Sequence, residues 1–89
     1  MHLKDARLPV MAEIIADDAP VTEIWTREAF CALGDGDLDT DAILDGIRGL
    51  GFGGWLVVEQ DIFPRTAERF ARAARDQRDN RAFLAARDL

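Results

Sequence analysis

The sequence predicts a small, helix-rich α/β fold with two strand–helix units in parallel. A short apolar run, residues 55–58, follows a glycine pair and ends in two carboxylates, Glu59 and Asp61. Such a run suits a strand buried on both faces better than it suits a helix. Helical patterns precede and follow it, and the first residues of the chain, around His2, read as the stub of an earlier strand. This order of elements is typical of parallel α/β proteins.

Length and charge limit the classes of function. The chain has 89 residues, enough for one small domain, so residues 1–89 are treated as a single unit. Its net charge is −6, which argues against binding to nucleic acid or to an anionic membrane surface. No stretch approaches the roughly 20 apolar residues of a membrane span, and the N-terminus has no signal-peptide pattern. We therefore expect a cytoplasmic protein.

Three motifs suggest a functional site, but the chemistry of their residues does not favour that interpretation. Cys31 is the only cysteine, and a small buried hydrophobic residue is expected there rather than a reactive thiol. Alternating aspartates over residues 35–41 suggest calcium, but the required glycine and glutamate positions hold Thr40 and Gly46. The glycine-rich residues 49–54 match a dinucleotide fingerprint, yet they close a helix instead of following a strand.

Helical spacing predicts three helices besides the one that precedes the strand. Residues 9–16 carry apolar positions at helical spacing after a proline. Thr22 is placed to cap a second helix, through residue 29, and the long final helix covers residues 65–87. Within that final helix, the charged residues 75–81 are expected to form a solvated face.

The helix over residues 40–50 has the clearest start and stop signals. Asp39 is expected to cap its N-terminus. Gly51 suits the left-handed position just after its end. Gly46 and Gly49 each cost roughly 1 kcal/mol relative to alanine inside a helix, so we expect a close approach to a sheet there.

The strand predicted over residues 55–61 carries the most informative side chain. Because side chains alternate along a strand, Trp55, Val57 and Glu59 share one face. Ligands bind at the carboxyl ends of strands in parallel α/β folds, which makes Glu59 a candidate functional residue. A strand followed by an ordinary polar loop is the alternative.

The segment His2-Leu3-Lys4-Asp5 places an imidazole, an ammonium and a carboxylate within four residues. His2 is a candidate metal ligand, because a neutral imidazole is a common one. A solvent-exposed histidine with no role is the alternative at this position.

Four segments together resemble a known family. Residues 2–5, 30–39, 51–61 and 80–84 resemble successive motifs of the xylose-isomerase-like TIM barrels, the sugar phosphate isomerase/epimerase superfamily. The inosose dehydratase branch is the most similar. The resemblance implies that the chain is the C-terminal portion of a (β/α)8 barrel, its last two βα units, truncated at strand 7.

The resemblance also implies a site and a cofactor. His2 matches the strand-7 ligand and Glu59 the strand-8 ligand of a divalent metal, Mn, Co or Mg. Glu59 additionally matches an acid/base group of the epimerases in the family, which makes it a candidate catalytic residue. Lys4 and Asp5 are candidate substrate-binding residues, with a sugar or cyclitol as the substrate.

The same resemblance implies that the chain is an incomplete enzyme. A full barrel has about 250 residues, so the other strands and the remaining ligands are expected from elsewhere, such as a complementing N-terminal chain. We expect no tight metal site and no turnover from this chain alone. Unpaired strand edges predict marginal stability or self-association. A non-enzymatic α/β association module, or a non-functional relic of such an enzyme, are the alternatives.

Overall fold

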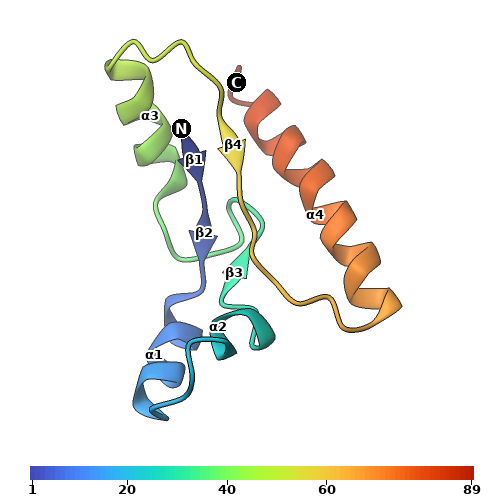
Figure 1. Cartoon of the computed structure of the whole chain (residues 1–89). Coiled ribbons are helices and arrows are strands. Elements are labelled where there is room, and N and C mark those ends of the chain that lie inside the picture. The colour runs from blue at the N-terminus through green and yellow to red at the C-terminus, as the bar shows by residue number, and fades with distance from the viewer.

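The computed structural model describes residues 1–89 and consists of short strands and longer helices (Figure 1). In chain order the elements are β1 (His2–Leu3), β2 (Asp5–Ala6), α1 (Leu8–Ala16), α2 (Glu23–Thr26), β3 (Phe30–Cys31), α3 (Thr40–Gly49), β4 (Val57–Val58) and α4 (Ala67–Ala85). Helices α3 and α4 flank the β1–β4 pair, and α1 and α2 lie together beyond β2 and β3. The predicted α/β class is confirmed, whereas the barrel stays a prediction. No helix is both long and apolar enough to cross a membrane.

The parallel arrangement predicted for the first and last strands is confirmed. Strands β1 and β4 pair in parallel, with His2 opposite Val57 and Leu3 opposite Val58. The amide of Glu59 donates to the carbonyl oxygen of Leu3 at 2.9 Å and extends the ladder by one bond. Because the strands run the same way, the residues that follow each of them meet at one edge.

A second, antiparallel sheet was not predicted. Strand β2 pairs with β3, which places Asp5 opposite Cys31 and Ala6 opposite Phe30. Two-residue strands leave no alternating pattern in the sequence, so only their pairing reveals them. The prediction for Cys31 is confirmed: its side chain is buried, and that burial raises the pKa of the thiol to about 11.

The predicted signals around α3 are confirmed. The Oδ1 atom of Asp39 accepts a hydrogen bond from the amide of Ala42 at 3.0 Å, and Gly51 adopts a φ of 66° just after the helix. The close approach proposed for Gly46 and Gly49 is wrong, because a Cβ atom added at either would meet nothing within 4 Å.

The other helices differ from the prediction to different degrees. Helices α1 and α4 lie close to their expected ranges, and the Thr66 hydroxyl caps α4 by accepting from the amide of Arg69 at 3.1 Å. Helix α2 is a single turn, and the predicted Thr22 cap is wrong, because Thr22 itself has helical dihedral angles and makes no capping bond. Glu28, with φ of 53°, prevents the helix from reaching residue 29.

The strand predicted over residues 55–61 is much shorter, and its burial on both faces is wrong. Only Val57 and Val58 are in strand conformation, and the Trp55 side chain is 87% exposed. One face of this segment, with Leu56 and Val58, packs on the core. The other face is open to solvent, since Val57 as well as Trp55 is exposed on it. One edge of β4 is also free, because β1 is the only strand paired with it.

The core lies between α3, α4 and the β1–β4 pair. It consists of five buried apolar residues: Leu3, Leu33, Leu44, Ile47 and Leu84. Asn80 of α4 is also buried, and its Oδ1 atom accepts a hydrogen bond from the amide of Leu33 at 2.7 Å. The solvated face predicted for residues 75–81 is therefore wrong at Asn80, which anchors α4 to the core.

Candidate functional site

Four charged or ionisable side chains meet at the carboxyl edge of the β1–β4 pair. His2 and Lys4 come from β1 and the residue after it, and Glu59 and Asp61 follow β4. The Nδ1 atom of His2 is hydrogen-bonded to Oε1 of Glu59. The Nζ atom of Lys4 lies 3.3 Å from Oε2 of Glu59 and 2.7 Å from Oδ2 of Asp61. These four side chains are called the edge cluster below.

The edge cluster is electrostatically coupled. Hydrogen bonds from Lys4 and then from His2 hold the pKa of Glu59 below its usual value of 4.5. The hydrogen bond to Asp61, and a weaker one to Glu59, raise the pKa of Lys4 above 10.5. At neutral pH Glu59 is therefore a carboxylate and Lys4 an ammonium. The ammonium also lies 4.6 Å from the centre of the Phe30 ring, a cation–π contact that fixes its position further.

The kinds of side chain present suit a divalent metal, but there are too few of them to form a metal site. His2 and Glu59 bring an imidazole nitrogen and a carboxylate oxygen together, and both are ordinary metal ligands. No group of three or more His, Cys, Asp or Glu side chains is arranged to hold a metal ion. The Lys4 ammonium beside Glu59 also opposes a second cation. A metal centre here would need ligands from outside these 89 residues.

Asp5 lies apart from the edge cluster and organises a loop. Its side chain is fully buried. Its Oδ1 atom accepts from the amides of Ala6 and Leu38, at 2.8 and 3.3 Å. Its Oδ2 atom accepts from those of Gly34 and Gly36, at 2.9 and 3.1 Å. Gly36 is required, because a Cβ atom there would lie 2.5 Å from the carbonyl oxygen of Ala6. The substrate-binding role suggested for Asp5 stays a prediction.

Sequence reasoning gave no role to Asp61 or to the aromatic residues beside it. Asp61 lines a cavity of about 360 Å³ with Trp25, Ile62 and Phe63. The rings of Trp25 and Phe63 meet edge to face, with their centroids 5.2 Å apart. The edge cluster thus has an apolar wall on one side. Trp25 comes from α2, far from Asp61 in the sequence, so no local motif could have revealed this neighbour.

The edge cluster lies at the carboxyl edge of a parallel strand pair, and this is the edge at which ligands bind in parallel α/β proteins. The chain is similar to curated proteins that share one name. The chain is similar to the inosose dehydratase of Erwinia tasmaniensis, with 36% identity over 78 residues, 88% of this chain and 26% of the relative. The inosose dehydratase of Glaesserella parasuis is 35% identical over the same shares of each protein. That of Histophilus somni is 37% identical over 67 residues, 75% of this chain and 22% of the relative.

The chain spans about a quarter of the length of the curated relatives it matches. No family model matches the chain. No solved structure matches it either. The relatives support a likeness to inosose dehydratases over most of this chain, in agreement with the resemblance noted from the motifs.

Proposed function

We propose that this chain is one part of the active domain of a metal-dependent sugar or cyclitol isomerase, epimerase or dehydratase, of the inosose dehydratase kind. The observation that carries the proposal is the contact between His2 and Glu59 across the parallel β1–β4 pair. Two potential metal ligands that are 57 positions apart in sequence meet at the edge where parallel folds bind ligands.

In the proposed site, His2 and Glu59 hold a divalent metal, Mn, Co or Mg, together with ligands from the rest of the protein. When bound, such a metal polarises a substrate hydroxyl or carbonyl group and makes the neighbouring carbon–hydrogen bond more acidic. Glu59 is ionised at neutral pH, so its carboxylate can accept a proton from a substrate carbon.

Lys4 and Asp61 act around that carboxylate. The Lys4 ammonium can donate a hydrogen bond to a substrate oxygen while it keeps Glu59 ionised. Asp61 holds the ammonium in place from the other side. In this scheme Asp5 does not contact the substrate. Its hydrogen bond from the amide of Ala6 holds the backbone next to Lys4 in place, and Asp5 supports substrate binding in that way.

Complementation with a relative tests the proposal. The chain is co-expressed with that part of the Erwinia tasmaniensis inosose dehydratase that lies outside the matched residues, and dehydration of inosose is measured. We expect turnover only when both polypeptides are present. Glu59→Gln should lower kcat by about 100-fold or more, a typical loss for an acid/base group. Glu68→Gln, on the exposed surface of α4, is the matched control. Unchanged turnover in Glu59→Gln would remove Glu59 from the mechanism.

Metal binding by the isolated chain gives a second test. Two protein ligands leave most of the coordination sphere to water, so little affinity is gained over the hydrated ion. Calorimetric titration with Mn²⁺ should therefore detect no submicromolar site. Submicromolar binding that disappears in His2→Ala would show that the chain already forms a complete centre.

A non-enzymatic association module is the second candidate, and the exposure of Trp55 favours it. An 87% exposed tryptophan beside a strand with one free edge is a ready surface for another chain. A single stable oligomer of the isolated chain without metal, combined with no activity in complementation, would favour this candidate over the enzyme fragment.

A further inference from the structure

We infer that Trp25 and Phe63 form an apolar platform for one face of a neutral ring polyol, whose hydroxyl groups are bound by the edge cluster. The inference rests on the proposed function, since the ring is that of the substrate. The cavity that these two aromatic side chains line encloses about 360 Å³, at the lower end of the range for ligand pockets, which suits a single ring. Asp61 lines this cavity and also binds Lys4, so the cavity and the edge cluster are continuous.

The platform is formed by residues far apart in the sequence. Trp25 belongs to α2, and Phe63 lies in the connection from β4 to α4 (Figure 1). Their rings meet edge to face, at an interplanar angle of 64°, so neither ring covers both faces of the other. Phe63 keeps 41% of its surface exposed, and Ile62 beside it is half-buried. An apolar surface is therefore open to a ligand directly beside the charged edge.

The charges beside the platform select a neutral ligand. Glu59 and Asp61 share a single ammonium, that of Lys4, whose Nζ atom lies 3.3 Å from the first carboxylate and 2.7 Å from the second. A carboxylate or phosphate ligand would be repelled by the two acids. A cationic ligand would compete with Lys4 for the same two carboxylates. An uncharged ligand meets neither obstacle.

Hydroxyl groups suit the polar side of this cavity, because each can both donate and accept a hydrogen bond. The Asp61 side chain is 52% exposed, so its carboxylate has lone pairs for a ligand hydroxyl besides the one bonded to Lys4. A wholly apolar ligand would remove water from Asp61 without replacing its hydrogen bonds. A ring polyol in a chair form satisfies both sides: equatorial hydroxyls point outward to the charged edge, and axial C–H groups form an apolar face for the platform.

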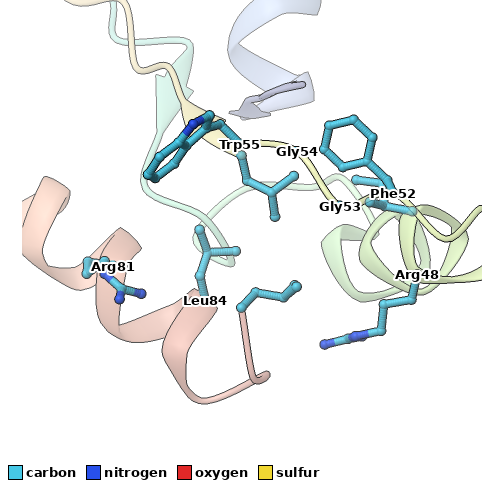
Figure 2. A pocket seen from close by; sticks show the side chains of 10 residues that line it. Arg48, Phe52, Gly53, Gly54, Trp55, Arg81 and Leu84 are labelled. Carbon is cyan, nitrogen blue, oxygen red and sulfur yellow. The ribbon is translucent and has the colours of Figure 1, made fainter.

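Two isomeric probes test the inference by NMR titration of the isolated chain. All hydroxyls of scyllo-inositol are equatorial, whereas neo-inositol carries one axial hydroxyl on each face. We expect millimolar binding of scyllo-inositol that shifts the indole N–H resonance of Trp25. The neo isomer should bind about fivefold more weakly, because an axial hydroxyl holds the ring off the platform. Trp55 is the internal control, since Figure 2 places it at a different cavity, between α3 and α4. Equal binding of both isomers, an unmoved Trp25 resonance, or equal shifts of both indoles would overturn the inference.

Matched phenylalanine variants assign the platform. Phe63→Leu keeps an apolar side chain but removes the ring, and it should weaken scyllo-inositol binding about fivefold, roughly the value of one aromatic contact. Phe70→Leu changes an exposed phenylalanine of α4 that lines neither cavity, and it should leave binding unchanged. Circular dichroism of both variants should match the parent spectrum, because both residues are exposed. An equal loss of binding in the two variants would contradict a platform at Phe63.

The complemented enzyme separates this inference from the proposed function. With inosose as the substrate, Phe63→Leu should raise KM about fivefold and leave kcat nearly unchanged, because contact with a ring face stabilises bound substrate and transition state alike. An unchanged KM with normal turnover would overturn the platform and leave the proposed function in place. Absence of turnover in the parent pair, together with selective scyllo-inositol binding at Trp25, would overturn the proposed function and support the platform as a ring-polyol site.

Discussion

Two regions of this molecule differ in how well their polar groups are hydrogen-bonded and their apolar groups are buried. The Asp5 corner, made of β2, β3 and residues 33–38, buries a carboxylate and gives it four backbone amides. The β4 segment, residues 52–61, is equally rich in apolar residues, yet it exposes Trp55 and has one paired neighbour. Of these two regions of similar composition, the one that holds a buried charge is thus the better buried.

The contrast shows where each region finds its partners. A buried charge is tolerated when hydrogen bonds replace its water, and the loop after β3 supplies all of the amides except that of Ala6. A hydrophobic strand needs strands on both sides and a layer on each face, and these 89 residues give it one strand and one covered face. Four predictions test this contrast, from the largest expected effect to the smallest.

Asp5→Ala should be the most damaging change, because four amides would lose their acceptor. Hydrogen bonds to a charged group are worth about 1.5–3 kcal/mol each, so we expect a loss of at least 3 kcal/mol in the free energy of unfolding. Urea unfolding followed by circular dichroism measures it. Asp35→Ala, an exposed aspartate of the same loop, is the control. An equal loss of unfolding free energy in Asp5→Ala and Asp35→Ala would contradict the special role of the buried carboxylate.

Asn80→Ala should cost about 1–3 kcal/mol, because the buried amide of Leu33 would lose its acceptor. The same unfolding experiment applies. Asp79→Ala changes the preceding, exposed residue of α4 and should have an effect below about 0.5 kcal/mol. A negligible effect of Asn80→Ala would mean that α4 is held by its apolar contacts alone.

Trp55→Ser should change association rather than stability. The side chain is exposed, so we expect a change in unfolding free energy below about 0.5 kcal/mol. If the β4 segment mediates self-association, sedimentation velocity should show a lower oligomer fraction than for the parent chain. Ile15→Ser, at a 78% exposed position of α1, is the control. Equal oligomer fractions in both variants and the parent would exclude the β4 segment as the interface.

The smallest effect concerns the pKa of Glu59. Lys4 and His2 hold this pKa below 4.5. Their hydrogen bonds to the Glu59 carboxylate therefore stabilise the fold above pH 4.5, and this contribution is lost as the pH falls through the lowered pKa. Lys4→Met should raise the titration midpoint of the Glu59 carboxyl carbon in an NMR experiment. The pKa of Asp41, lowered chiefly by its hydrogen bond to Arg87, should not move. A constant Glu59 midpoint would show that Lys4 is not its main partner.

The sequence by itself determined the features that depend on neighbouring residues. The Asp39 cap joins positions three apart, and Gly51 stops α3 through its own backbone angle. Capping and left-handed turns are local, so a short window of sequence contains all that they need. The sequence also predicted two parallel strands and a functional role for His2 and Glu59, and β1 and β4 bring those two side chains together.

The tertiary structure decided what depends on residues far apart. Asp5 is buried because amides 29 to 33 positions away turn toward it, and Asn80 is buried because it meets Leu33 at a separation of 47. The length of β4 was also decided there, since a strand extends only as far as its neighbour pairs with it. Residue type specifies what a side chain can bond to, but long-range packing determines whether that partner is present.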